Sequence, residues 1–213
     1  MEIDRSKISP MMKQYLDTKD DYPDTILFFR VGDFYEMFFD DALLVSKTLE
    51  LTLTGKECGL EERAPMCGVP HHSSEIYVKK LIEAGYKVAI CEQLTDPSEG
   101  KGIVQRDVIR VVTPGTLIES SMLNDDNNNY ICCAYYDNQS CGMCFADIST
   151  GEVRLALVDG GKNLEPELVD LLSRYSPAEV IFNPEFLSLK TVLDFIKEKL
   201  GCSVTLRESE CFD

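Results

Sequence analysis

A polar, turn-prone stretch near the middle of the chain constrains the fold more than any other feature. Residues 117–129 include the run SSMLNDDNNN, which is poor in residues that form hydrophobic cores. On both sides of it, apolar runs of strand or helix length recur at short intervals. We therefore predict two domains, at residues 1–116 and 130–213, joined by a linker at 117–129.

In the first half, segments with strand and helix patterns alternate, which is typical of an α/β domain. Thr25–Val31 is an apolar run of strand length, and apolar residues from Tyr35 to Leu49 recur at helical spacing. This predicts a helix directly after Gly32 and Asp33, with Asp33 and Glu36 forming a capping box. The other expected elements are a strand at 51–54, a loop at 55–70, a helix at 73–84 ended by Gly85, a strand at 86–92, a turn-rich loop at 96–102 and a strand at 108–112.

The second half begins with a different pattern. Three strand-like runs, at 130–136, 142–148 and 152–158, are separated by short polar turns, which predicts an antiparallel meander. A helix at 165–175, a strand at 179–182, a helix at 186–200 and a strand at 203–206 are expected to follow.

The charge balance argues against a general coat for polyanions, because the net charge is −16. Residues 1–116 carry 14 Lys and Arg against 20 Asp and Glu, and residues 117–213 carry 7 against 17. Any DNA contact is therefore expected in the first half. The more acidic second half also leaves open an alternative function, a protein-interaction scaffold. No apolar run approaches ~20 residues, so neither a transmembrane helix nor a secretory signal is predicted. The nine cysteines show no regular framework, which favours reduced thiols and a cytoplasmic location.

The segment after the first strand carries a candidate recognition site. In the predicted helix Phe34 lies about 100° from Tyr35, which places it beside the core rather than inside it. An exposed aromatic ring near the Glu36 carboxylate suits a wedge that enters a base step and meets a displaced base. The alternative is that Phe34 is peripheral core and Glu36 only caps the helix. Lys56, Arg106 and Arg110 are candidate phosphate contacts, although ordinary solvated positions explain them equally well.

Two enzyme classes receive less support. Cys58, Cys67, His71 and His72 could form a metal or thiol site, but their spacing matches no common zinc frame. The single CxxC, formed by Cys141 and Cys144, lies in a strand-like run and is best read as two strand thiols. No Walker-type phosphate-binding motif occurs, so nucleotide hydrolysis by that mechanism is not expected.

Five ordered motifs in the first half, and a sixth in the second, resemble those of one protein family. They are SPMMKQYL at 9–16, FRVGDFYEMF at 29–38, APMCGVPHH at 64–72, VAICEQ at 88–93, VVTPGT at 111–116 and ADISTG at 146–151. Together they resemble the N-terminal part of the MutS family of bacterial DNA mismatch-repair proteins. The resemblance covers essentially the whole chain.

The resemblance implies a mixed-sheet α/β mismatch-recognition domain followed by an incomplete RNase H-like connector domain. It implies that Phe34 enters the minor groove and stacks on the mispaired base, and that Glu36 hydrogen-bonds this base. By the same matching, Pro65 and Met66 belong to a loop near the minor groove. Lys56 and Arg106 fall where the family places DNA backbone contacts.

The resemblance also implies that the chain is a fragment of a longer parent protein. The parent would be an ATPase that uses ATP and Mg and forms a homodimer through its ATPase domain, and the connector would help to bind MutL. For the fragment itself we expect no catalytic activity, no cofactor, no metal and no membrane partner. Asp147 matches a position where RNase H enzymes carry a metal-binding Asp, but no acidic partner set follows, so a non-catalytic connector is expected.

Overall fold

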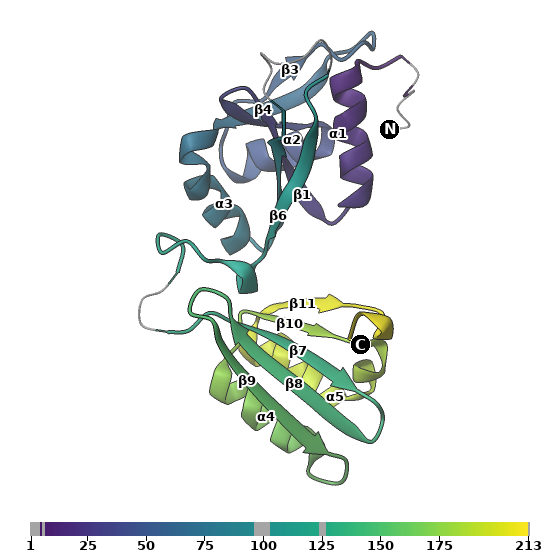
Figure 1. Ribbon diagram of the computed structural model, residues 1–213, viewed down its shortest axis with the longest axis vertical. Helices are drawn as coiled ribbons and strands as arrows, with labels where there is room; N and C mark the ends of the chain where they lie inside the picture. The colour runs from purple at the N-terminus through teal and green to yellow at the C-terminus, as the bar shows by residue number, and fades with distance from the viewer. Residues whose placement is uncertain (1–4, 6, 96–102, 124–126, 213) are drawn as a thin grey trace. The chain divides into compact units, whose positions relative to one another are not determined.

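The computed structural model describes residues 5, 7–95, 103–123 and 127–212 (Figure 1). The chain divides into two compact units, Met1–Thr113 and Pro114–Asp213, each built around its own sheet. The predicted class, a two-domain α/β protein, is confirmed. The domain limits 1–116 and 130–213 stay predictions about which segments fold independently. The predicted loop at 96–102 and part of the linker, 124–126, lie outside the described residues.

The first unit contains a six-stranded mixed sheet in the order β3-β4-β2-β1-β5-β6. Strands β1 and β5 are parallel, and every other neighbouring pair is antiparallel. The strands are β1 Thr25–Val31, β2 Phe34–Phe38, β3 Thr54–Lys56, β4 Ala64–Pro70, β5 Lys87–Gln93 and β6 Arg106–Val112. The helices are α1 Pro10–Asp21, α2 Phe39–Thr48 and α3 Ser74–Glu83.

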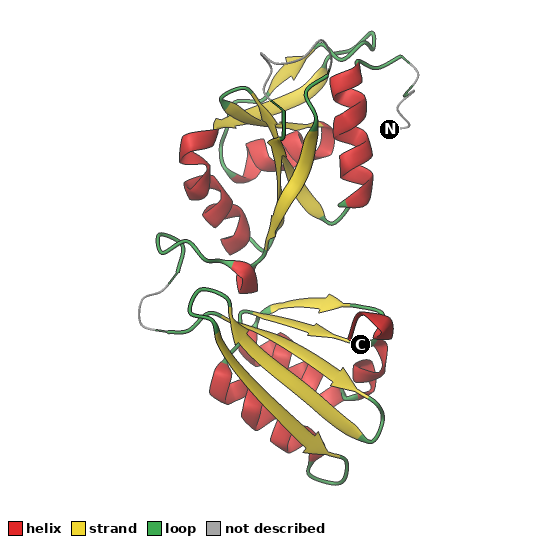
Figure 2. Ribbon diagram, viewed as in Figure 1, coloured by secondary structure: helices red, strands yellow, loops and turns green. Residues whose placement is uncertain are grey.

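Helices cover both faces of this sheet (Figures 1 and 2). Helix α1 packs Met12, Tyr15 and Leu16 against buried residues such as Phe29 of β1. The other face is covered by α2 and α3. Helix α1 was not among the predicted elements, although Pro10 follows Ser9 at the helix start and the three buried residues have helical spacing.

The segment after Gly32 and Asp33 is a strand, so the helix predicted from Tyr35 onward is wrong over its first turn. Strand β2 pairs antiparallel with β1 through a two-residue turn in which Gly32 has φ +58°. The apolar residues from Tyr35 to Phe39 fit a helical period, but hydrogen bonding to β1 on one side and β4 on the other favours the extended form. Helix α2 begins only at Phe39, and the predicted capping box does not form.

The loop predicted at 55–70 is also wrong in large part, because it contains most of β3 and all of β4. The predicted strand at 51–54 is regular only at Thr54. Glycine and proline in this segment signalled a loop, yet pairing of β4 with both β2 and β3 overrides the local preference. The later elements agree with prediction to within two residues, and Gly85 ends α3 with φ +88°.

The second unit contains a five-stranded sheet in the order β11-β10-β7-β8-β9. The antiparallel meander β7-β8-β9 is confirmed, and β10 runs parallel to both β7 and β11. The strands are β7 Tyr130–Tyr136, β8 Ser140–Asp147, β9 Glu152–Asp159, β10 Glu179–Phe182 and β11 Ser203–Leu206. This mixed arrangement agrees with the RNase H-like class expected for the unit.

The helices of the second unit pack on one face of its sheet (Figure 2). Helix α4 spans Leu164–Tyr175, as predicted to within one residue. The helix predicted at 186–200 is instead interrupted: a 3-10 helix at Pro184–Ser188 precedes α5, Lys190–Phe195, and a π-helical turn at Ile196–Leu200 follows. The break occurs at Leu189, whose φ of −84° and ψ of 74° leave the helical region. None of the helices in the described ranges is long and apolar enough to cross a membrane.

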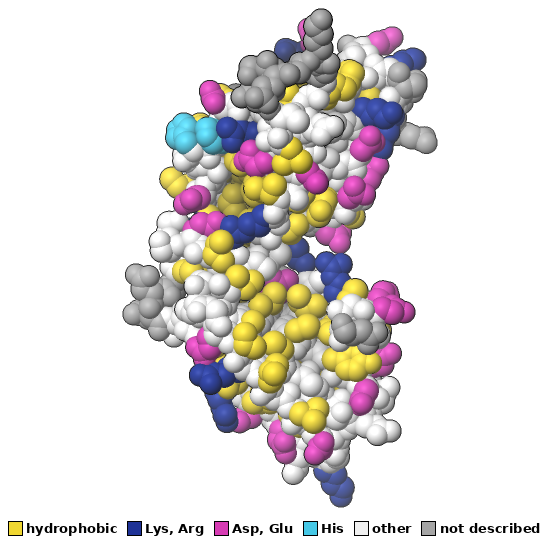
Figure 3. All heavy atoms as spheres, in the orientation of Figure 1, with side chains coloured by type: hydrophobic (Ala, Val, Ile, Leu, Met, Phe, Trp, Pro, Cys, Tyr) yellow, Lys and Arg dark blue, Asp and Glu magenta, His cyan; other side chains and the backbone are white. Residues whose placement is uncertain are grey.

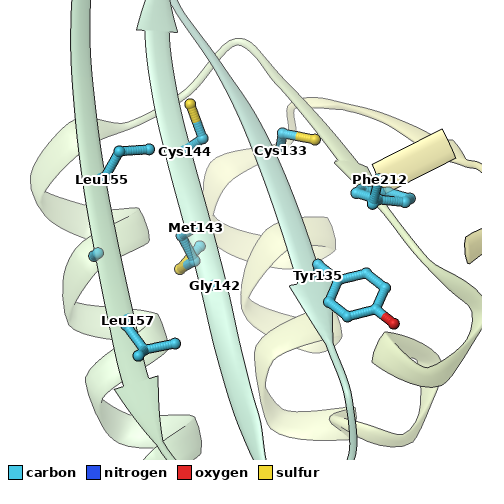
Figure 4. A pocket seen from close by; sticks show the side chains of 9 residues that line it. Cys133, Tyr135, Gly142, Met143, Cys144, Leu155, Leu157 and Phe212 are labelled. Atoms are coloured by element: carbon cyan, nitrogen blue, oxygen red, sulfur yellow. The ribbon is translucent and has the colours of Figure 1, made fainter.

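The opposite face of the second sheet is apolar and open (Figure 3). Leu155 and Leu157 on β9 are 80% and 72% exposed, and Tyr135 on β7 is 40% exposed. They line a shallow hollow of about 400 Å³, together with Cys133 and Phe212. Figure 4 shows the side chains of these residues. Strand alternation explains why this face is exposed. Along β7 and β8, every second residue points into the helix-covered core, and the residues between them point to the open face.

Asp147, at the end of β8, organises the turn between β8 and β9. Its buried carboxylate accepts hydrogen bonds from the Ser149 hydroxyl at 2.6 Å and from the Ser149, Thr150 and Asn129 backbone N–H groups at 2.9–3.3 Å. Burial alone would raise the pKa of Asp147, but these hydrogen bonds outweigh it and hold the pKa below its ordinary value. The Asp147 carboxylate therefore has a structural role: its hydrogen bonds hold the turn between β8 and β9 together.

Asp147→Asn is expected to destabilise the second unit by about 1–3 kcal/mol at pH 7, because an amide cannot accept all of these hydrogen bonds. A lowered folded-state pKa stabilises the fold above the unfolded-state pKa, and this stabilisation is lost as the pH falls through the folded-state value. The difference from the wild type should therefore shrink below about pH 4. Urea denaturation at pH 7 and pH 3 measures it, with Asp159→Asn on the exposed end of β9 as the control. An equal effect at both pH values would contradict this account.

Candidate nucleic-acid interface

The hairpin of β1 and β2 presents Phe34 to solvent. Phe34 is the first residue of β2, directly after the turn, and is 47% exposed. Its neighbour Tyr35 points to the opposite face of the sheet and is buried. The predicted position of Phe34 outside the core is confirmed, but strand alternation produces it rather than a helical offset.

Glu36 lies two residues further along β2 and therefore on the same face as Phe34. It pairs with Gly68 of β4, where a Cβ atom would lie 3.3 Å from the Tyr35 carbonyl oxygen and 3.7 Å from Glu36 Cγ, so the glycine lets the two strands approach closely. The Lys56 ammonium on β3 donates a hydrogen bond to Glu36 Oε2. The alternative role of Glu36 as a helix cap is excluded, because the residue is inside a strand.

Lys56 reaches Glu36 from the edge strand of the sheet. It pairs with Ala64 of β4, and its Nζ atom lies 5.7 Å from the centre of the Phe38 ring. Met66, also partly exposed, pairs with Phe38 on one side and Thr54 on the other. Pro65 pairs with Gly55. Pro65 and Met66, expected in a loop, are thus part of β4. Four of the six predicted contact residues lie on one face of the connected strands β2, β3 and β4: Phe34, Glu36, Lys56 and Met66.

Arg106, the remaining predicted contact, makes several contacts inside the first unit. Its Nε atom donates to the Arg30 carbonyl oxygen at 2.6 Å, and its Nη1 atom donates to Gln14 Oε1 at 3.0 Å. The guanidinium also stacks 4.9 Å from the centre of the Phe29 ring. Partial burial lowers the pKa of Arg106. In this structure the guanidinium joins β6 to β1 and α1, and its contact with DNA stays a prediction.

The turn that carries Phe34 is held from several directions. The Gly32 N–H donates to Gln93 Oε1 at 2.9 Å, and the His71 N–H donates to the Asp33 carbonyl oxygen at 2.9 Å. Below the turn, the Tyr35 hydroxyl donates to Glu92, which also lies 3.4 Å from Arg30 Nη1. Burial and the Glu92 carboxylate raise the pKa of Tyr35. A turn fixed in this way can hold an exposed ring in position.

The alternative metal or thiol site is not assembled. Cys58 lies in the core beneath α1, whereas Cys67 is buried next to α2, with its thiol 3.6 Å from the Ala42 carbonyl oxygen. Burial raises the pKa of Cys67 to about 11, which disfavours the reactive thiolate. Over the described ranges, the structure brings no three His, Cys, Asp or Glu side chains together as metal ligands.

Sequence reasoning missed Gly68 and the role of His71 in the turn. Gly68 allows β4 to lie close to Glu36, because a Cβ atom there would contact Glu36 Cγ and the Tyr35 carbonyl oxygen, and His71 supports the turn through Asp33. A glycine between two apolar strand residues is a signal for close approach of another group. That signal was hidden because the whole segment was interpreted as a loop.

Comparison with known proteins agrees with this layout. The family model described as MutS domain I matches residues 9–121, and the one described as MutS domain II matches residues 129–213. The DNA mismatch repair protein MutS of Clostridioides difficile is 52% identical over 198 residues, which are 93% of this chain and 20% of that protein. Its counterpart in Acetivibrio thermocellus is 48% identical over 208 residues, or 98% of this chain and 24% of the relative. The chain thus spans about a fifth to a quarter of the length of these relatives.

Proposed function

Because the chain belongs to the MutS family, with regions that match its domains I and II, we propose that its first unit recognises mismatched DNA by inserting Phe34 at the mispaired base. The observation that carries the proposal is the half-exposed Phe34 ring on a fixed two-residue turn, with Glu36 on the same face. In this proposal Phe34 stacks on the mispaired base, and Glu36 hydrogen-bonds it.

The proposed mechanism selects a lesion by its deformability. A mispaired step is easier to unstack and kink than a paired one, so an aromatic wedge costs less free energy there. Stacking on the displaced base then compensates for the unstacking. Because every base has an aromatic face, such a wedge acts on many lesions without reading the sequence around them.

The rest of the proposal concerns the longer protein. Relatives four to five times as long as this chain carry the name DNA mismatch repair protein. We propose that the parent is a homodimeric ATPase that uses ATP and Mg, and that the second unit is a connector that helps to bind MutL. For the present chain we propose a recognition role without catalysis.

The isolated chain is expected to bind DNA weakly, with a preference for a G·T duplex over a matched one. Its first 116 residues carry a net charge of −6, which does not favour strong attraction to phosphates. A small number of phosphate contacts gives a shallow salt dependence, with a slope of about −1 to −3 on a logarithmic plot.

NMR titration with short G·T and matched duplexes at several salt concentrations measures the two affinities and their salt dependence. A matched titration with residues 117–213 in place of the whole chain gives the background of the second unit. Tight and steeply salt-dependent binding of both duplexes would contradict the expected weakness. Equal affinity for the two duplexes would contradict the proposed function.

A further inference from the structure

Lys56 and Glu36 form an ion pair across the middle of a three-stranded segment of the sheet. Glu36 on β2 and Lys56 on β3 both border β4, where they pair with Gly68 and Ala64 respectively. Gly68 carries no side chain and Ala64 only a methyl group, and Met66 lies between them on the same face of β4. The Lys56 side chain crosses β4 and donates to Glu36 Oε2.

The ion pair is partly shielded from water. The Glu36 side chain is 14% exposed and that of Lys56 is 28% exposed. A carboxylate this far removed from water needs a partner for its charge. If Lys56 turned away to bind a phosphate, Glu36 would be left without that partner next to a polyanion. The geometry therefore opposes a role for Lys56 as a phosphate contact.

The carboxylate still has an oxygen to offer. Lys56 contacts Oε2, and among the described residues no hydrogen-bond donor contacts Oε1. A carboxylate has two oxygens and accepts several hydrogen bonds, so the ion pair and a bond from a base are compatible. Lys56 thus holds Glu36 in one orientation while leaving a free acceptor on the same face as Phe34.

We infer that Lys56 is a positioning residue for Glu36: it orients the carboxylate and compensates its charge so that Glu36 can meet a base beside the DNA phosphates. This inference rests on the proposed function of Phe34 and Glu36. It replaces the phosphate contact expected for Lys56 by an action through another side chain.

A double-mutant cycle separates the two roles. The wild type, Lys56→Met, Glu36→Gln and the double variant are titrated with G·T and matched duplexes, and Lys47→Met on the exposed side of α2 controls for lost charge. Lys56→Met is expected to lower the ratio of G·T to matched affinity by about tenfold, as for one lost hydrogen bond to a charged group. In a chain that already carries Glu36→Gln, adding Lys56→Met should not lower this affinity ratio further.

A phosphate contact gives a different result. Lys56→Met would then weaken both duplexes equally, reduce the salt slope by about 0.9 and act independently of Glu36. That outcome, or an unchanged affinity ratio in Lys56→Met, would overturn the inference while leaving the proposed function standing. A wild-type chain with no preference for G·T would instead count against the proposed function and, with it, this role.

A measurement without DNA tests the ion pair itself. In ¹⁵N NMR spectra the Lys56 ammonium should exchange its protons with water more slowly than the exposed Lys47 ammonium. Glu36→Gln should remove that difference. If Lys56 and Lys47 exchange equally fast in the wild type, the ion pair is not held in solution and the inference fails whatever the DNA results are.

Discussion

Phe34→Ala is expected to abolish the preference for a mismatched duplex while leaving the melting temperature of the protein nearly unchanged. The ring is half exposed at the start of β2, so its removal takes little from the core. Stacking of one base on an aromatic side chain contributes about 1–3 kcal/mol, which corresponds to roughly a 5- to 150-fold loss in affinity for the G·T duplex. Affinity for the matched duplex should change little. NMR titration and thermal denaturation measure the two effects.

Leu43→Ala is the matched control for this experiment. Leu43 on α2 is also 47% exposed, but it lies outside the proposed interface. Its replacement removes a similar exposed apolar side chain and should leave both affinities unchanged. If Phe34→Ala kept the wild-type preference for G·T, the wedge would not be Phe34. If Leu43→Ala lowered the preference equally, the loss would reflect general exposed apolar surface.

Asp41→Ala is expected to give the largest loss of stability in the first unit. The buried Asp41 carboxylate accepts hydrogen bonds from the Leu27 N–H at 2.9 Å, the Lys19 ammonium at 2.9 Å and the Tyr15 hydroxyl at 3.2 Å. It therefore joins α1, β1 and α2. Burial and the Asp41 charge hold the pKa of Tyr15 well above its ordinary value, so its hydroxyl remains a donor that needs an acceptor.

Removing one partner of a buried charged network costs about 3–5 kcal/mol, which is a large part of the ~5–15 kcal/mol that stabilises a typical domain. Asp40→Ala is the control, because Asp40 is exposed and shares the first turn of α2. Both substitutions remove a negative charge near the helix N-terminus, worth about 0.3–1 kcal/mol, so the difference between them isolates the buried network. Chemical denaturation followed by circular dichroism measures it, and equal destabilisation by both variants would contradict the role of Asp41.

The sequence alone predicted the elements whose local signals agree with their environment. In the meander of the second unit, strands with alternating apolar residues are separated by polar turns. In α3, apolar residues recur at helical spacing and a glycine follows the end of the helix. The ordered motifs identified the family and pointed to Phe34 and Glu36. The predictions of these elements and of the family succeeded because period, turn residues and motif order depend only on neighbours along the chain. The roles of Phe34 and Glu36 stay predictions.

Local signals misled where two periods coexist. Tyr35, Phe38, Phe39 and Ala42 have helical spacing, yet the first two belong to β2 and the last two to α2. The signal that favoured a hairpin was the pair Gly32 and Asp33 between two apolar runs, since a glycine at the first position suits a two-residue turn. Choosing between the two required knowledge of β4, which pairs with β2 from about thirty residues away.

Thus the sequence by itself determined the family, the two-unit organisation and the identity of the proposed wedge. Only the tertiary structure decided that Phe34 and Glu36 share one strand face, that Lys56 contacts Glu36, and that Arg106 joins β6 to β1 and α1. The physical reason is that interstrand hydrogen bonds and ion pairs join residues far apart in the chain. Their partners are set by strand order and register, which no local pattern encodes.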